Sequence, residues 1–206
     1  MKRLIVIGAG GHGKVVADTA SRMAKWDAIE FVDLRFPDLR QCACWQVVGK
    51  NLQDLDYIKD NVNFVVAVGN NALRLKLYRE ALSAGFEPAT VIHPSASISS
   101  FADIGKGTVI FANAVVNIHA SLSECVIVNT GATVDHDCVI GEGVHLSPGV
   151  NLAGEVSVGK ESWIGIGASV MQQINISENV MVGAGAVVIR DVPGNTTVVG
   201  VPAKPI

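Results

Sequence analysis

The sequence has few of the features that mark several large classes of protein. Charged residues make up 17% and aromatic residues 5% of the 206 positions, and the formal net charge is -3. No segment is dense in Lys or Arg, although nucleic-acid-binding proteins need such segments to neutralise phosphates. We therefore expect no nucleic acid among the partners.

Long apolar runs and paired cysteines are also scarce. The first apolar run, Leu4 to Ile7, is too short for a signal peptide or a membrane anchor and leads into a glycine loop. We expect a cytoplasmic protein without membrane insertion. The four cysteines are Cys42, Cys44, Cys125 and Cys138. Because they form neither paired CxxC motifs nor a disulfide framework, we interpret them as ordinary reduced thiols.

Small aliphatic residues are abundant instead, and in the second half of the chain they recur with a period of six. The periodic positions are Ile92, Ile98, Ile104, Ile110, Val116, Leu122, Val128, Val134, Ile140, Leu146, Leu152, Val158, Ile164, Val170, Ile176, Val182 and Val188. This period fits short strands joined by tight corners, with one aliphatic side chain per strand directed into a common core. Three such strands form a triangular coil of about 18 residues, and about five coils stack at strand spacing.

The first part of the chain shows a different pattern, in which strands alternate with helices. The predicted elements are strands over 3–7, 29–33 and 64–68 and helices over 14–23 and 72–84. A βαβ arrangement of this kind forms a small parallel sheet and binds ligands at the carboxyl ends of its strands. We predict two domains, 1–88 and 89–206, the second of which ends in a C-terminal tail.

A glycine loop follows the first predicted strand. Gly8, Gly10 and Gly13 fit the G-x-G-x-x-G pattern of nucleotide-binding loops, and Asp33 lies twenty residues after Gly13. Phosphates would then lie against the N-terminus of the following helix. The domain is about half as long as a usual dinucleotide domain, and no hydride-transfer domain follows it. A nucleotide-linked sugar is therefore favoured over a dinucleotide, and a purely structural glycine turn is the other alternative.

Six motifs along the whole chain resemble, in this order, those of the NeuD/PglD family of bacterial sugar acyltransferases. They are IGAGGHGK at 7–14, VD at 32–33, AVGN at 67–70, VIHP at 91–94, DHDCVIG at 135–141 and GVPAK at 200–204. The resemblance implies a Rossmann-like βαβ domain that binds a nucleotide sugar, followed by a left-handed parallel β-helix of hexapeptide repeats. It also implies a homotrimer that binds acetyl-CoA between adjacent β-helices.

The activities of the family leave several substrates open. They include N-acetylation of UDP-linked 4-amino-4,6-dideoxy sugars, N-acetylation of GDP-perosamine and O-acetylation of sialic acid. We expect an acetyl-CoA-dependent N-acetyltransferase of UDP-4-amino-4,6-dideoxy-N-acetylglucosamine that needs no metal, although the sequence does not separate N- from O-acylation. A non-catalytic β-helix scaffold or a carbonic-anhydrase-like metal protein is the alternative from another class. The spacing of the histidines disfavours the metal protein.

Acyl transfer from a thioester needs a base and a stabilised oxyanion. His136 lies two residues after an inward aliphatic position, in a register that faces solvent at a corner of the prism, and Asp135 and Asp137 flank it. By resemblance His136 is the catalytic base and Asp137 its partner. Gly154 follows 18 residues later, directly above His136 on the next coil, and the resemblance implies that its N–H holds the thioester carbonyl. The simpler alternatives are a solvated histidine and a corner glycine.

The same reasoning predicts direct attack of the sugar amine on acetyl-CoA, without a covalent enzyme intermediate. Cys138, the thiol nearest to His136, occupies an inward small-residue register and should be an inert core residue.

The resemblance also implies which residues bind the two substrates. For acetyl-CoA they are His145, Gly165, Gly183, Gly185 and Lys204. For the acceptor they are Gly10, Gly11, His12, Asp33, Gly69 and Asn70. Simple structural alternatives exist here too, since His145 could be a surface residue, Lys204 a solvated one, and glycines are common at prism corners.

Overall fold

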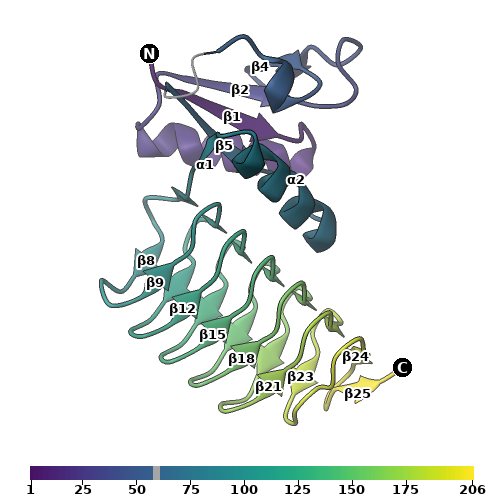
Figure 1. The fold of residues 1–206 in the computed structure, drawn as a ribbon. Helices are drawn as coiled ribbons and strands as arrows, with labels where there is room; N and C mark the ends of the chain where they lie inside the picture. Colours follow the sequence, from purple (N-terminus) through teal and green to yellow (C-terminus); the bar gives the residue numbers. More distant parts are fainter. Residues whose placement is uncertain (58–60) are drawn as a thin grey trace. The chain divides into compact units, whose positions relative to one another are not determined.

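A computed structural model of the protein describes residues 1–57 and 61–206. The chain divides into two compact units, Met1–Pro94 and Ser95–Ile206, both visible in Figure 1. Among the described residues, no helix is both long enough and apolar enough to span a membrane.

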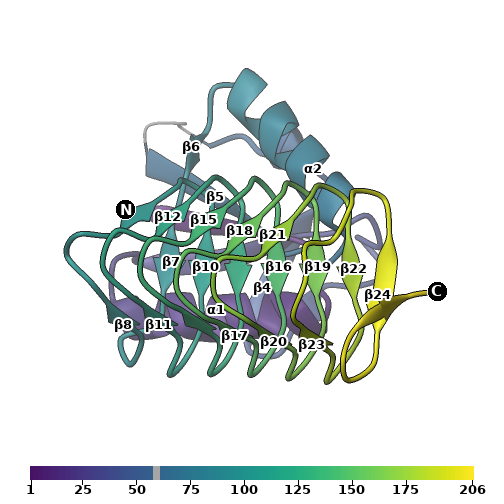
Figure 2. The ribbon, with the colours of Figure 1, turned by 90° about the horizontal axis from the view of Figure 1, so that it is seen from below.

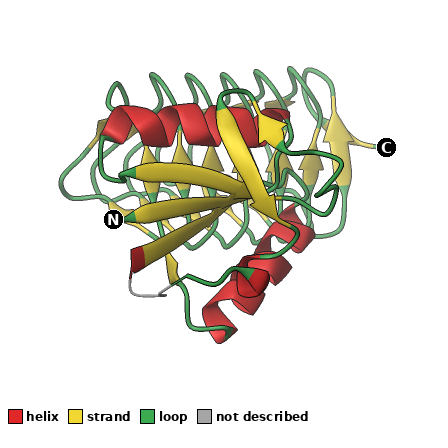
Figure 3. Ribbon diagram, turned by 90° about the horizontal axis from the view of Figure 1, so that it is seen from above, coloured by secondary structure: helices red, strands yellow, loops and turns green. Residues whose placement is uncertain are grey.

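The first unit is an α/β domain around one mixed sheet. Its elements are β1 (Arg3–Ile7), α1 (Gly11–Met23), β2 (Ala28–Val32), β3 (Gln41–Cys42), β4 (Trp45–Gly49), the 3-10 helix η1 (Leu52–Asp54), β5 (Val62–Val66), α2 (Asn71–Ser83), β6 (Glu87–Pro88) and β7 (Val91–Ile92). The strand order is β3-β4-β2-β1-β5-β6, and every pair is parallel except β3 with β4. Figure 3 shows the strands and helices of this unit in separate colours.

Strand β1 lies in the centre of this sheet. Leu4, Ile5 and Val6 are fully buried, as is usual for a central strand of a parallel sheet. Ile7 lies opposite Val32 of β2 and Val66 of β5, so the carboxyl ends of the three strands meet at one edge. The strand order reverses between β1 and β5, which is where open α/β sheets form their ligand-binding crevice.

All five elements predicted in this part of the chain are present: β1 begins at the predicted residue, and the other four begin one to three residues earlier than predicted. The two units meet later in the sequence than the boundary placed between residues 88 and 89. β6 extends the sheet beside β5, and β7 packs against α1. Both short strands lie within Met1–Pro94, the range of the first unit.

The second unit is a parallel β-helix. Its strands are β8 (Ser97–Ile98), β9 (Asp103–Ile104), β10 (Val109–Ile110), β11 (Val115–Val116), β12 (Ser121–Leu122), β13 (Ile127–Val128), β14 (Thr133–Val134), β15 (Val139–Ile140), β16 (His145–Leu146), β17 (Asn151–Leu152), β18 (Ser157–Val158), β19 (Trp163–Ile164), β20 (Ser169–Val170), β21 (Asn175–Ile176), β22 (Met181–Val182), β23 (Val187–Val188), β24 (Thr197–Val199) and β25 (Lys204–Pro205). Figure 2 shows the coils stacked along the axis.

Every third strand belongs to the same face of the prism. Val109 pairs with Ile127 and Ile127 with His145, so one coil contains 18 residues, as the hexapeptide period predicts. At the C-terminal end β24 and β25 form an antiparallel pair that ends one of the sheets. The predicted fold, an α/β domain followed by a left-handed parallel β-helix, is confirmed.

The periodic aliphatic side chains fill the prism. From Ile110 onward each of them is at most 3% exposed. Ile98 and Ile104 are only half-buried because they belong to the first coil, against which another coil stacks on one side only. Burial of one such side chain contributes about 1.5–3 kcal/mol, so the stacked columns make a large stabilising contribution to this unit.

Candidate active site

His136 lies at the corner between β14 and β15, and its side chain is 48% exposed. Its Nδ1 is 2.8 Å from Asp137 Oδ2. A carboxylate can only accept a hydrogen bond, so Nδ1 carries the proton and Nε2 is left as the basic nitrogen. The hydrogen bond to Asp137, followed by the charges of Asp135 and Glu155, raises the pKa of His136 above 6.5. The pair has the arrangement of a base with its orienting acid.

The backbone of this corner is held by a second acid. Asp135 Oδ1 accepts the backbone N–H of His136 at 2.8 Å and the side-chain amide of Asn117 at 2.7 Å. The amide of Asn117 is the main reason that the pKa of Asp135 lies below its usual value. Asn117 was not predicted as a site residue, although its position one coil before Asp135 is a signal that could have identified it.

Gly154 lies against the ring of His136 on the next coil. A Cβ at this position would come within 2.5 Å of Cε1 and Nε2 of His136. The backbone of Gly154 is outside the left-handed region, so the site needs a glycine for its small volume and not for its conformation. The structure thus brings His136, Asp137 and Gly154 together, as the sequence predicted.

His145 is not a surface residue, so that alternative is wrong. It is 8% exposed, and its ring stacks on Trp163 of the next coil with centroids 4.8 Å apart and planes inclined by 24°. Its Nε2 is 3.3 Å from Nδ2 of Asn129. The indole N–H of Trp163 donates to Ser147 Oγ at 2.8 Å. Neither Asn129 nor Trp163 was predicted as a site residue, although Trp163 follows His145 by one coil.

Steric contacts within the prism or the backbone conformation explain why Gly165, Gly183 and Gly185 are glycines. A Cβ at Gly165 would come within 2.6 Å of the Val182 carbonyl oxygen, and one at Gly183 within 2.7 Å of Val199 Cγ1. Gly185 has a φ of +66°, which favours glycine. Contacts of these glycines with coenzyme A remain a prediction.

Lys204 lies in β25 near the C-terminal end of the prism. It is exposed and lines a cavity of about 170 Å³ together with Arg190 and Asp191. Two of these three side chains are cationic, so an anionic group would be attracted there, although Asp191 opposes it. The pairing of Lys204 with a coenzyme A phosphate remains a prediction.

The four glycines of the first loop have two different functions. Gly8 has a φ of +106°, and a Cβ on Gly13 would collide with the Gly8 carbonyl oxygen. These two glycines shape the loop and let α1 pack closely on the sheet. A Cβ on Gly10 or Gly11 would meet nothing within 4 Å. The open space at the N-terminus of α1 is therefore at the two glycines predicted to contact the acceptor.

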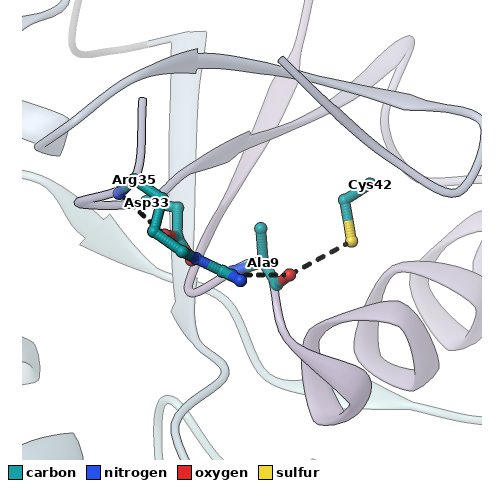
Figure 4. A network of polar contacts seen from close by, with 4 residues as sticks. All are labelled: Ala9, Asp33, Arg35 and Cys42. Carbon is teal, nitrogen blue, oxygen red and sulfur yellow. Dashed lines mark hydrogen bonds and ion pairs between the residues drawn. The ribbon is translucent and has the colours of Figure 1, made fainter. Parts of the chain in front are cut away.

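Asp33 and Arg35 hold this loop by hydrogen bonds to Ala9, as Figure 4 shows. Asp33 Oδ2 accepts the Ala9 N–H at 2.8 Å, and Arg35 donates to the Ala9 carbonyl at 3.1 Å and to Asp33 Oδ1 at 2.8 Å. The Arg35 guanidinium holds the pKa of Asp33 well below its usual range. Cys42 Sγ also approaches the Ala9 carbonyl, at 3.6 Å. Asp33 therefore shapes the loop, and its predicted contact with a ribose or base remains a prediction.

His12, in the first turn of α1, is a neutral imidazole at neutral pH. Burial, and then the charge of Arg74, lowers its pKa to about 4. Arg74 is 1% exposed and donates to the carbonyls of Val68 and Gly69 at 3.0 and 3.3 Å. Arg74, which was not predicted as a site residue, thus fixes the loop that contains the predicted residue Gly69.

Asn70, the neighbouring predicted residue, caps helix α2. Its Oδ1 accepts the Leu73 N–H at 2.9 Å, which is the usual contact of an asparagine N-cap. This contact explains the asparagine without a ligand, so its predicted role in binding the acceptor remains a prediction.

A cavity of about 240 Å³ opens at the carboxyl edge of the α/β sheet. It is lined mainly by apolar side chains, such as Val32 and Leu52, and its polar groups include Asp33 and Lys50. Its volume lies slightly below the range of about 300–1,000 Å³ for sites that enclose a whole drug-sized ligand. The cavity can therefore enclose part of a nucleotide, such as its base.

Within residues 1–57 and 61–206, no three side chains of His, Cys, Asp or Glu are grouped as a metal site would require. The histidine–aspartate pair therefore has no metal centre of protein ligands beside it. A repetitive parallel β-helix with such a pair at a corner has the architecture of the hexapeptide-repeat acyltransferases.

Comparisons with known proteins agree with this class. The profile of the PglD N-terminal domain matches residues 3–81. UDP-N-acetylbacillosamine N-acetyltransferase of Bacillus subtilis (strain 168) is 39% identical over 109 residues, which are 52% of this chain and 50% of that protein. The match thus spans about half the length of that curated relative.

Solved structures of several proteins are similar over the full chain, among them those of two bacterial proteins. The acetyltransferase domain of PglB from Neisseria gonorrhoeae FA1090 has a TM-score of 0.96 and 42% identity, with all of both chains covered. It has also been solved in complex with acetyl coenzyme A. PerB from Caulobacter crescentus, solved with CoA and GDP-perosamine, has a TM-score of 0.92 and 37% identity and covers 100% and 98% of the two chains. The chain belongs to the NeuD/PglD family of bacterial sugar acyltransferases.

Proposed function

We propose that the protein transfers an acetyl group from acetyl-CoA to the amino group of a nucleotide-linked amino sugar. The main support for the proposal is the arrangement of His136, Asp137 and Gly154. Asp137 orients the ring of His136, and the ring lies against Gly154, where any larger residue would collide with it. The Bacillus subtilis relative is named for this kind of reaction, and PerB was solved with a nucleotide-linked amino sugar.

The reaction follows from the hydrogen bonding of His136. Nε2 takes a proton from the sugar amine as the amine nitrogen attacks the thioester carbonyl, and the carboxylate of Asp137 stabilises the imidazolium. The N–H of Gly154 holds the oxyanion. Within residues 1–57 and 61–206, this N–H has no backbone acceptor. Collapse forms the amide C–N bond and breaks the C–S bond, and His136 returns the proton to the departing coenzyme A thiolate.

The α/β unit would bind the acceptor through its nucleotide. The open backbone at Gly10 and Gly11, at the N-terminus of α1, suits the phosphates. The neutral imidazole of His12 can donate a hydrogen bond to the phosphates or the sugar. The cavity beside Asp33 suits the ribose or the base. Gly69 and Asn70 complete this proposed acceptor site.

We infer that UDP-4-amino-4,6-dideoxy-N-acetylglucosamine is the acceptor, on the basis of the 39% identity with the UDP-N-acetylbacillosamine enzyme. GDP-perosamine is the second candidate, since PerB resembles the chain over its full length. On the donor side, His145, Gly165, Gly183, Gly185 and Lys204 are the proposed contacts of acetyl-CoA. The proposal includes a homotrimer in the cytoplasm with acetyl-CoA between adjacent β-helices; a monomer by light scattering would contradict it.

The decisive experiment measures thiol release from acetyl-CoA with UDP-4-amino sugars, GDP-perosamine and free or CMP-linked sialic acid as acceptors. His136→Asn would be compared with His119→Asn, a matched change of an exposed corner histidine whose φ of +60° also suits asparagine. We expect turnover with one amino sugar, a loss of a hundredfold or more in the His136 variant, and little change in the control. Turnover with sialic acid alone, or an active His136 variant, would contradict the proposal.

A further inference from the structure

Arg74, near the start of α2, carries a charge that is buried inside the α/β unit. The residue is 1% exposed, although arginine is rarely buried without specific hydrogen-bond partners. Its Nη1 donates to the backbone carbonyls of Val68 and Gly69 at 3.0 and 3.3 Å. Its Nη2 donates to Asn71 Oδ1 at 2.9 Å. Two consecutive carbonyls of the turn between β5 and α2 therefore point towards one guanidinium.

The direction of these two carbonyls fixes the direction of the N–H groups that follow them. In a planar trans peptide unit the C=O and the N–H point in opposite directions. The backbone N–H groups of Gly69 and Asn70 therefore point away from the guanidinium. Within residues 1–57 and 61–206, neither of these N–H groups has a backbone acceptor. Because a backbone N–H normally finds a hydrogen bond, both groups can donate to a ligand.

The turn lies beside the parts of the α/β unit that are proposed to bind the acceptor. A Cβ on Gly69 would meet nothing within 4 Å, so a ligand can approach the backbone there. Val68 lines the cavity of about 240 Å³ at the carboxyl edge of the sheet. A Cβ on Gly8 would come within 3.2 Å of Val68 Cγ2, so the turn packs against the first glycine loop. Burial, and then the charge of Arg74, lowers the pKa of His12 in the same region.

We propose that Arg74 is a positioning residue for the acceptor, because it orients the N–H groups of Gly69 and Asn70 to donate to the diphosphate. Two adjacent N–H groups that point the same way suit anionic oxygens. The diphosphate would then lie between this turn and Gly10 and Gly11 of the facing loop, so the inference rests on the proposed function. The guanidinium is buried, so Arg74 acts through the turn and does not itself contact the acceptor.

The first test is structural and needs no acceptor. Crystal structures of the full-length wild type and of Arg74→Met compare the two peptide planes between residues 68 and 70. We expect at least one plane to turn in Arg74→Met, because methionine offers no donor to the two carbonyls. Arg79→Met removes a cation from the exposed side of the same helix and should leave both planes unchanged. Unchanged planes in Arg74→Met would overturn the proposal.

The second test measures kinetics with the amino sugar that the acceptor panel identifies. We expect Arg74→Met to raise the KM of the acceptor about tenfold or more, the effect of losing a hydrogen bond to a charged group. The KM of acetyl-CoA and kcat should stay within about threefold of wild type, and Arg79→Met should change neither KM. A merely structural role would lower the amount of active enzyme and leave the acceptor KM unchanged, and that result would contradict the proposal.

Arg74→Lys keeps both tests possible if Arg74→Met does not fold, which thermal unfolding shows. Lysine retains the charge, but its single nitrogen cannot replace a planar guanidinium that donates to three acceptors. We expect a smaller turn of the peptide planes and a rise of about threefold in the acceptor KM. An acceptor KM and a turn both identical to wild type would overturn the proposal. If no acceptor is turned over, the proposed function fails, while the crystal structures still decide whether Arg74 orients the turn.

Discussion

The ring of His136 lies so close to Gly154 that a Cβ at Gly154 would come within 2.5 Å of both Cε1 and Nε2. The position of the proposed base thus depends on a missing side chain on the next coil. Since the coils are held in register by parallel strand pairs, such as Thr133 with Asn151, neither partner can move away freely. This relationship makes the glycine as informative for the mechanism as the histidine.

We predict that Gly154→Ala displaces the imidazole of His136 and lowers kcat by about a hundredfold, the usual effect of a displacement of about 1 Å in a catalytic group. The same overpacking should lower the free energy of unfolding by about 1–3 kcal/mol. Thiol-release kinetics and urea unfolding measure the two effects.

The control for this prediction is the double variant with His136→Ala. Removal of the ring removes the overlap, so Gly154→Ala should cost little stability in that background. An equal loss of stability with and without the ring would mean that the added methyl group collides with something other than His136.

The acid limb of the pH profile should report the raised pKa of His136. The base acts when it is neutral, so kcat/KM should increase with pH through a midpoint above 6.5, the ordinary value. Asp137→Asn removes the main cause of the raised pKa, and its midpoint should therefore move to lower pH while the plateau falls. Measurement of kcat/KM between pH 5.5 and 9, given as an approximate working range, tests both expectations.

The matched variant for the pH profile is Asp103→Asn, which removes an exposed carboxylate from the same prism. Its midpoint should stay at the wild-type value. A midpoint that does not respond to Asp137→Asn would contradict the assignment of His136 as the titrating base.

The sequence was most informative where the fold repeats. The uninterrupted period of six predicted the prism, its 18-residue coil and the exposure of His136, because each position recurs in the same environment. The relation of His136 to Gly154 also followed, since residues one coil apart must lie above one another. A regular fold therefore turns spacing in the sequence into contacts in space.

The contacts that the sequence did not predict are those of side chains outside the inward register. His145 was considered as a possible surface residue, yet it is buried under a Trp163 ring that the six-residue pattern does not distinguish. In the α/β unit, the strands β3, β4 and β6 were not predicted, and β3 and β6 contain only two residues each, which carry no periodic signal. Arg74 was missed because a charged helical residue is usually exposed.

Asp33 should stabilise the α/β unit in a pH-dependent manner. Its pKa in the folded protein lies below the ordinary 3.8, so its stabilising effect is present above that value and is lost as the pH falls. We expect Asp33→Asn to reduce the free energy of unfolding by about 1 kcal/mol at pH 7, since the exposed Arg35 is screened by solvent. The difference in unfolding free energy between wild type and Asp33→Asn should become smaller below about pH 4. Urea unfolding at several pH values measures this difference.

Asp18→Asn is the comparison for this prediction, because Asp18 forms an exposed ion pair with Arg22 on α1. Such a pair contributes about 0.3–0.5 kcal/mol, and its loss should have little effect on stability. If the unfolding free energies of wild type and Asp33→Asn differ by the same amount at every pH, the carboxylate of Asp33 does not hold Ala9 as proposed.

Direct transfer without an acyl-enzyme requires Cys138 to be dispensable for activity. Its side chain is fully buried, burial raises the pKa of its thiol, and its Sγ donates to the Ala153 carbonyl at 3.2 Å. A protonated thiol in the core is a poor nucleophile. We therefore expect Cys138→Ala to retain kcat within about twofold and to lose about 1 kcal/mol of stability with the hydrogen bond. Loss of activity in a folded variant, or an acetylated wild-type protein by mass spectrometry after incubation with acetyl-CoA alone, would instead indicate a covalent route.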